Sequence, residues 1–166
     1  MGVSRMGSGS HTMSYYMALL HGMDPHKLSF VVANNFANLR AGVRSDQFDA
    51  FLWETFTTQP YFASGELSKL GDVQTPWPAF SFICNPGKLS PEQARAVREA
   101  FFPALARACK NFTDDVTGSV ARIIQQHAHT PEDAAKWLST VRYSTDFTID
   151  AKRIGHAVDV LKQTGV

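Results

Sequence analysis

The stretch from Gly2 to Met23 constrains the fold of this chain more than any other. Its sequence, GVSRMGSGSHTMSYYMALLHGM, reads as a short strand, a glycine and serine turn, and a helix. Gly7 and Gly9 let the backbone curl closely around a ligand, and Ser10 or Thr12 can cap the helix that follows. A helix N-terminus offers unpaired N–H groups and partial positive charge, so it favours a carboxylate, sulfonate or phosphate. The stretch therefore predicts a contact with a small anionic ligand.

The helix of this stretch carries an apolar stripe, which predicts that one face is buried against a sheet. The stripe consists of Met13, Tyr16, Met17 and Leu20, at spacings of three and four residues. His11, at the start of the helix, can add a hydrogen-bond donor to the turn. Glycine and serine are also common in turns that bind nothing. The residues alone leave a ligand site and an ordinary strand-to-helix turn both open.

Strand-like and helical patterns alternate up to residue 75. Short apolar or β-branched runs occupy residues 28–32, 49–53 and, more weakly, 67–73. Helical spacing marks residues 36–44 and 54–64 between them. Such alternation is typical of βαβ units. We therefore expect an α/β fold, with residues 1–75 forming a ligand-binding lobe around a parallel or mixed sheet.

The segment Thr75-Pro76-Trp77-Pro78 ends this alternation, because two prolines around a tryptophan continue neither a helix nor a central strand. Residues 76–78 are expected to form a crossing segment, followed by an apolar strand at residues 79–84. From Ser90 onward the pattern is helical, and Pro103 is expected to kink the first of these helices. Residues 79–166 thus form a strand plus C-terminal helices.

Composition excludes several classes of function. With 44% hydrophobic residues, 19% charged residues and a net charge of +1, the chain has no charge excess to hold nucleic acid or acidic lipid. No apolar run reaches the length of a membrane span, and the N-terminus lacks a secretion-signal pattern. We expect a cytoplasmic protein with neither nucleic acid nor membrane as a partner.

Three segments together resemble a known family. They are GVSRMGSGSH near the start, DAFLWETFTTQPYFASGELSKLGDVQTPWP in the middle and AAKWLSTVRYS near the end. Their order and spacing are similar to those of ABC-transporter substrate-binding proteins with the type II periplasmic-binding fold. The likeness is to the nitrate, sulfonate and thiamine-pyrimidine-precursor group and its intracellular eukaryotic relatives.

This resemblance implies a ligand site on two α/β lobes, of which the chain holds the second lobe and a remnant of the first. The matching positions assign ligand contacts to the turn, to the end of a strand and to the crossing segment. These residues are Ser8, Gly9, Ser10, His11, Trp53, Glu54, Thr75 and Trp77. For the tryptophans plain packing is the alternative, and for Glu54 a solvated helix start.

The first functional hypothesis is non-catalytic binding of a small, anionic metabolite, without cofactor or metal. An enzyme similar to thiamine-pyrimidine synthases is the alternative, although the cysteine-rich segment of those enzymes has no counterpart here. A vestigial or structural protein without a ligand is the third. Ser10 and His11 are not a catalytic pair by adjacency, because neighbours on a helix point in different directions.

The apolar residues 79–84 and the helices after Ser90 also predict assembly. In a two-lobed relative they pack inside the first lobe, whose leading segment is absent from this sequence. A strand with an unpaired edge and exposed apolar helices favour a covering partner. An isologous homodimer through residues 79–109 is the expected solution.

Overall fold

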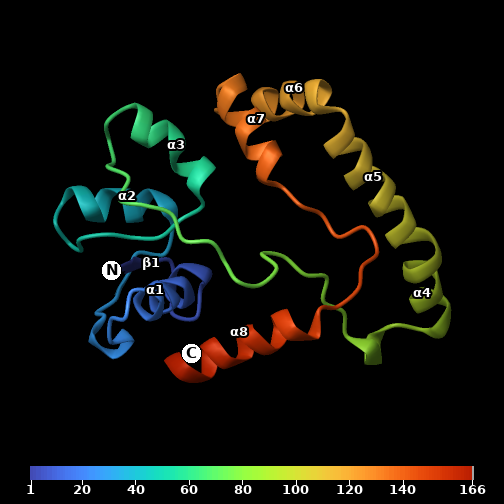
Figure 1. Ribbon diagram of the computed structural model, residues 1–166, viewed down its shortest axis with the longest axis horizontal. Coiled ribbons are helices and arrows are strands. Elements are labelled where there is room, and N and C mark those ends of the chain that lie inside the picture. Colours follow the sequence, from blue (N-terminus) through green and yellow to red (C-terminus); the bar gives the residue numbers. More distant parts are fainter. Residues whose placement is uncertain (166) are drawn as a thin grey trace. The chain divides into compact units, whose positions relative to one another are not determined.

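A computed structural model describes residues 1–165 and shows a mostly helical protein with a small parallel sheet (Figure 1). The strands are β1 (Gly2–Val3) and β2 (Val31–Val32). The helices of the first half are α1 (Gly9–Leu20), α2 (Phe36–Arg44) and α3 (Thr55–Ala63). Those of the second half are α4 (Pro91–Ala96), α5 (Phe102–Asp114), α6 (Val116–Gln126), α7 (Pro131–Thr140) and α8 (Ala151–Thr164). Short 3₁₀ turns occupy Pro25–Lys27 and Pro86–Lys88.

The sheet is built around β1. Gly2 and Val3 pair in parallel with Val31 and Val32 of β2, and Gly2 forms a further parallel bridge to Phe51. The backbone N–H of Gly2 donates to the Ala50 carbonyl. On the other side, the carbonyls of Met1 and Val3 accept hydrogen bonds from the N–H groups of Val31 and Ala33, so β1 has a partner on each side. The crossover from β1 to β2 carries α1, and the crossover from β2 back past β1 to Phe51 carries α2, so the right-handed rule for such connections predicts the two helices on opposite faces. Figure 1 shows this arrangement.

The core below α2 contains a closely enclosed aromatic ring. Leu39 of α2 is fully buried and packs with Ala33 and Phe48. Gly2 and Gly42 lie against the Phe48 ring, and a Cβ on either glycine would come within 2.3–2.4 Å of it. The two glycines therefore leave the space that the ring fills, and this packing fixes α2 against β1.

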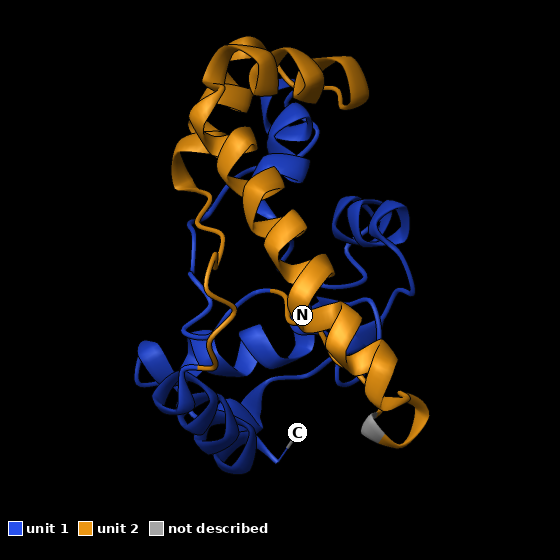
Figure 2. Ribbon diagram, turned by 90° about the vertical axis from the view of Figure 1, so that its right-hand side faces the viewer, with its two compact units in different colours: residues 1–79, 150–166 blue, residues 80–149 orange. Residues whose placement is uncertain are grey.

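The chain divides into two compact units (Figure 2). Unit 1 comprises Met1–Ala79 together with Asp150–Val166, and unit 2 comprises Phe80–Ile149. In unit 1, α8 packs against α1, and His156 meets Tyr16 with ring centroids 6.2 Å apart. The last helix therefore belongs with the α/β part of the chain.

Unit 2 is a set of helices with a small core. A π-helical segment, Val97–Phe101, joins α4 to α5 directly before Pro103, at the place where the sequence predicts a kink. Ile123, Ala134 and Leu138 of α6 and α7 are buried together. By contrast, α4 and α5 contain no buried residue.

The predicted strands are much reduced. The run 28–32 yields only β2, the run 49–53 yields only the bridge at Phe51, and residues 67–73 and 79–84 are not strands. Strand formation needs a neighbouring backbone for its N–H and C=O groups, and an apolar run alone does not supply one. The α/β prediction is therefore right only for a two-stranded parallel sheet, within a largely helical chain.

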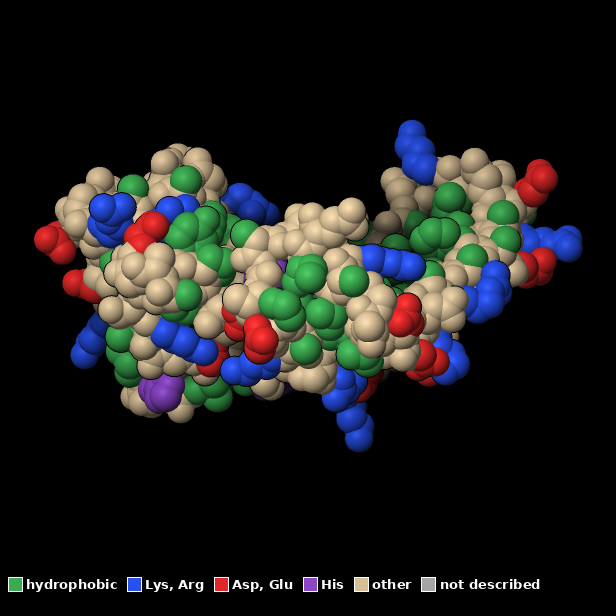
Figure 3. Space-filling view, turned by 90° about the horizontal axis from the view of Figure 1, so that it is seen from above, with side chains coloured by type: hydrophobic (Ala, Val, Ile, Leu, Met, Phe, Trp, Pro, Cys, Tyr) green, Lys and Arg blue, Asp and Glu red, His purple; other side chains and the backbone are tan. Residues whose placement is uncertain are grey.

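Large apolar side chains remain exposed in unit 2. Phe80 is 95% exposed and Ile83 is 93% exposed. Figure 3 shows hydrophobic side chains reaching the surface between the charged ones. Within the described residues, no helix has both the length and the apolar character needed to cross a membrane.

Candidate functional site

The ends of the parallel segments bring three helix N-termini to one edge of the sheet. Each of β1, β2 and the segment at Phe51 runs in the same direction and is followed within a few residues by a helix. The helices begin after the caps Ser8, Asn35 and Glu54. Strand order reverses between β1 and Phe51, which is where open α/β sheets bind their ligands, outside the carboxyl ends of the strands.

The turn after β1 is held by its own serines. Ser8, and not the predicted Ser10 or Thr12, is the cap of α1, and its Oγ accepts a hydrogen bond from the His11 N–H at 3.3 Å. The Ser8 and Ser10 hydroxyls lie 3.0 Å apart, and Ser10 Oγ also accepts from the Ser4 N–H at 3.4 Å. These bonds fix the start of α1 beside the end of β1.

The capping pattern decides which N–H groups remain open to a ligand. The Ser8 N–H donates to the Arg5 carbonyl, and the His11 N–H is used by the cap. The N–H groups of Gly9 and Ser10 have no hydrogen-bond partner among residues 1–165. Gly9 is exposed, and a Cβ built on it would meet no atom within 4 Å. Two adjacent donors at the positive end of α1 therefore remain unpaired within residues 1–165, beside an exposed position at Gly9.

His11 lies beneath this turn, in the interior. Its side chain is only 4% exposed, and its Nδ1 accepts a hydrogen bond from the Gly7 N–H at 3.1 Å. The ring meets Tyr15 and Phe30 edge to face at 4.8 and 4.6 Å. Burial lowers the pKa of His11 below its ordinary value of 6.5. The buried His11 side chain thus supports the turn from within.

Trp53 belongs to an aromatic cluster at the same sheet edge. Its ring stacks on Phe36, with centroids 5.2 Å apart and planes at 19°, and the side chain is still 39% exposed. Phe36 also meets Tyr61, over which the Arg40 guanidinium lies at 3.6 Å. Arg40 in turn holds Glu66 by two hydrogen bonds. The cluster fixes Trp53 while leaving part of its ring available.

Glu54 has a structural task in this arrangement. It caps α3, and its Oε2 accepts hydrogen bonds from the N–H of Thr57 at 2.6 Å and from the Thr57 hydroxyl at 2.8 Å. A carboxylate at a helix N-terminus also interacts favourably with the helix dipole. The geometry therefore favours the capping alternative for this residue over ligand contact.

We expect Glu54→Ala to lower the free energy of unfolding by about 1 kcal/mol, because the Thr57 N–H loses its acceptor. Glu54→Gln is the matched control, since its amide oxygen can still accept that bond. Chemical denaturation measures the stability, and sulfate titration measures anion affinity, which should not weaken in either variant. Loss of anion binding in Glu54→Ala at unchanged stability would instead identify Glu54 as a ligand contact.

The crossing segment lies against the body of α1. Trp77 meets Tyr16 with ring centroids 5.8 Å apart, two turns into the helix from its N-terminus. Thr75 is exposed. The structure therefore brings the turn and Trp53 to one sheet edge, and it places Trp77 in packing with Tyr16.

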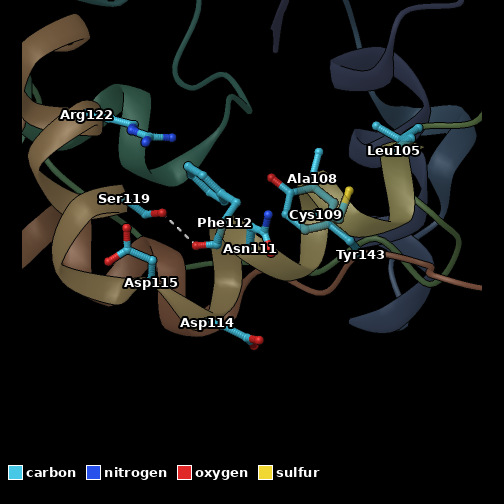
Figure 4. A pocket seen from close by; sticks show the side chains of 10 residues that line it. All are labelled: Leu105, Ala108, Cys109, Asn111, Phe112, Asp114, Asp115, Ser119, Arg122 and Tyr143. Atoms are coloured by element: carbon cyan, nitrogen blue, oxygen red, sulfur yellow. Dashed lines mark hydrogen bonds between the residues drawn. The ribbon is translucent and has the colours of Figure 1, made fainter. Parts of the chain in front are cut away.

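Unit 2 contains a cavity that the sequence did not indicate. It has a volume of about 890 Å³, and its lining comes from α5, α6 and Tyr143 (Figure 4). Leu105, Cys109 and Phe112 form an apolar wall, and the Ser119 hydroxyl donates to the Phe112 carbonyl at 2.7 Å. Burial raises the pKa of Tyr143, with a smaller contribution from Cys109. Two polar groups of the cavity lining already have partners, because Asp115 caps α6 and Asp114 forms an ion pair with Lys110.

Histidine, cysteine and carboxylate side chains do not gather into a metal-binding group anywhere in residues 1–165. His127 and His129 lie at the end of α6 with ring centroids 6.2 Å apart. At the turn, neither hydroxyl of Ser8 or Ser10 is bonded to the His11 ring, whose Nδ1 is occupied by Gly7.

Two comparisons with known proteins bear on the fold. Residues 1–73 match the family described as Ca3427-like PBP. The fold is similar to that of the Candida albicans CA3427 gene product, whose structure is described as defining a new family with the generic periplasmic binding protein fold. The TM-score is 0.78 at 26% sequence identity, and the match covers 99% of this chain but 55% of that chain.

The chain thus spans about half the length of that solved protein. No curated protein matches the sequence significantly. The predicted resemblance to the type II periplasmic-binding fold is confirmed, whereas the narrower likeness to the nitrate, sulfonate and thiamine-precursor group stays a prediction. The protein is therefore similar in the sequence of residues 1–73 to the Ca3427-like periplasmic-binding proteins. Nearly the whole chain matches the fold of the solved structure, of which it corresponds to about half.

Proposed function

We propose that the protein binds a small anionic metabolite, without chemical conversion, at the carboxyl edge of the β1–β2 sheet. The observation that carries the proposal lies at the start of α1: the N–H groups of Gly9 and Ser10 have no partner among the described residues, and the position at Gly9 is open. Backbone donors at a helix N-terminus hold oxyanions well, because the helix dipole adds to the hydrogen bonds.

The neighbouring side chains support a ligand with two parts. The Ser8 and Ser10 hydroxyls bond to each other, so one of the two keeps a hydrogen that it can donate to the anion. The exposed part of the Trp53 ring offers an apolar surface for the rest of the molecule, and its stacking on Phe36 fixes its orientation. A fixed aromatic ring costs little conformational entropy when a ligand packs on it. Small organic anions with a planar body therefore suit the edge best.

Thermal-shift measurements test the proposal directly. A ligand at about one hundred times its dissociation constant stabilises the folded state by about 2.7 kcal/mol, which raises the melting temperature by several degrees. The panel contains sulfate, alkyl and aryl sulfonates, carboxylates, pyrimidines and pyridoxal phosphate, each against chloride at equal ionic strength. A shift with the anions supports the proposal. An unchanged melting temperature across the whole panel would contradict the proposal and favour the alternative of a structural protein without a ligand.

We also propose that the protein forms a homodimer through residues 79–109. The support is the extent of exposed apolar surface there, including Phe80, Phe82 and Ile83, in a segment that has no strand partner among the described residues. Apolar surface of this kind is uncommon on monomers. In a symmetric dimer, each chain covers this apolar surface of the other with the same surface of its own.

We expect light scattering at micromolar concentration to give twice the mass of the 18.3 kDa chain. Ile83→Lys should shift the equilibrium toward monomer, because it places a charge in the apolar interface. Leu70→Lys is the control, since Leu70 is 87% exposed but lies outside this segment. A monomer mass for the unmodified protein would contradict the dimer.

A further inference from the structure

We propose that His11 is a positioning residue, which holds the turn in its ligand-binding form only while its imidazole is neutral. The inference rests on the proposed anion site and adds a pH dependence to it. It starts from the hydrogen bond that the Gly7 N–H donates to His11 Nδ1 at 3.1 Å. Gly7 lies two residues before Gly9, so this bond ties the entry of the turn to the helix that follows.

The bond determines which tautomer is present. An Nδ1 that accepts a hydrogen bond carries no proton, so the proton of neutral His11 lies on Nε2. Turning the ring over would place a carbon atom against the Gly7 N–H and leave that donor without an acceptor. Protonation at Nδ1 would place an N–H donor of the ring opposite the Gly7 N–H donor, and the hydrogen bond would be lost. The turn as observed is therefore compatible only with neutral His11.

The surroundings of His11 disfavour its charged form. The ring is packed between Tyr15 of α1 and Phe30, which precedes β2, and its buried Nε2 has no hydrogen-bond partner in the described part of the chain. Among the described residues, Tyr15 is the one titratable side chain in ring contact with His11, and burial is the cause that lowers the His11 pKa. Within residues 1–165, no carboxylate hydrogen-bonds to the ring to stabilise an imidazolium.

The direction of the pH effect follows from this lowered pKa. Well above pH 6.5, the ordinary pKa of histidine, His11 is neutral in the folded and unfolded chains alike, and its contribution to stability is complete. As the pH falls below this value, the unfolded chain binds a proton that the folded turn excludes, so stability and turn order are lost. If anion binding requires neutral His11, affinity falls by about tenfold per pH unit below the folded-state pKa.

Two variants separate positioning from simple filling of the interior. His11→Asn keeps an acceptor, because its Oδ1 stands the same number of bonds from Cα as Nδ1, but it does not titrate. His11→Phe keeps an aromatic ring between Tyr15 and Phe30 and removes the acceptor. Sulfate titration from pH 5 to 8 is the binding assay, since sulfate stays fully ionised over this range. Circular dichroism confirms that each variant is folded.

We expect the unmodified protein to lose affinity as the pH falls through the lowered pKa of His11, His11→Phe to bind weakly at every pH, and His11→Asn to recover affinity with a flat profile. Equal pH profiles for the unmodified protein and His11→Asn would overturn the proposal. NMR supplies a readout without ligand: the Gly7 amide should be protected from exchange above the His11 pKa and exposed below it. If sulfate fails to bind at any pH, the proposed function is wrong, and the Gly7 amide alone then decides whether His11 controls the turn.

Discussion

Replacing Gly9 with valine is expected to reduce sulfate affinity by at least tenfold while the melting temperature stays nearly constant. In a helix the Cα–Cβ bond tilts toward the N-terminus, so a side chain at the first helical position lies over the exposed N–H groups. There is open space for it in the protein, because no atom lies within 4 Å of the Cβ position. Valine is no worse than glycine as a helix former, so the fold should not suffer.

Gly71→Val is the matched control, because Gly71 also faces open space but lies far from the start of α1 in sequence. Isothermal titration with sulfate measures the affinity, and calorimetry measures the melting temperature. Normal binding by Gly9→Val would exclude the N-terminus of α1 as the anion site. A collapse of stability in this variant would show that the turn has a purely structural role.

Replacing Gly42 with alanine should destabilise unit 1 by about 1–3 kcal/mol, although alanine is the better helix former. The new Cβ would stand 2.4 Å from the Phe48 ring, which is 6% exposed and packed beside Leu39. A buried ring that packs against both Gly2 and Gly42 can shift only by disturbing its neighbours. The clash therefore outweighs the gain of about 1 kcal/mol in helix propensity.

Gly155→Ala supplies the opposite control, because Gly155 lies in α8 and its Cβ position is open. This variant should gain up to about 1 kcal/mol. Phe48→Leu replaces the ring with a smaller side chain and should by itself lower the stability. In the double variant it should nevertheless reduce the destabilisation caused by Gly42→Ala. Chemical denaturation of the four proteins gives the coupling energy, and simple additivity would show that the ring is not the cause.

Helix boundaries were predictable because their determinants are local. The capping box of Ser90 and Gln93 forms as the spacing of the two residues indicates, and Thr130 caps α7 through the Asp133 N–H. Strands were not predictable to the same degree. Phe80 and Ile83 have the composition of a buried strand, yet both are exposed, because pairing depends on a neighbour that the local sequence does not specify.

The buried face of α1 differs from the predicted apolar stripe. Leu20 is 56% exposed, whereas Ser14 and Ala18 are fully buried. Ser14 is tolerated there because its hydroxyl donates to the Ser10 carbonyl at 2.8 Å, within its own helix. Small residues on this face allow close packing, which a search for large apolar residues does not detect.

The location of the candidate site was predictable, but its donors were not. The glycine and serine turn marks the start of α1 in the sequence itself. Which N–H groups stay open depends on Ser8 being the cap, which uses the His11 N–H and leaves those of Gly9 and Ser10. The burial of His11 depends on Phe30, which is distant in sequence and brought close by the β1–β2 pairing.

The discontinuous sequence of unit 1 affects its biosynthesis. The helix α8, which packs on α1, is translated only after all of residues 80–149. Ribosomes add about 5–20 residues per second, so the surface of α1 around Tyr16 waits on the order of several seconds for its partner. During this interval the nascent chain presents both that surface and the exposed aromatic residues of the intervening segment. Chaperones that recognise apolar chain segments therefore have their best access before the last helix leaves the ribosome.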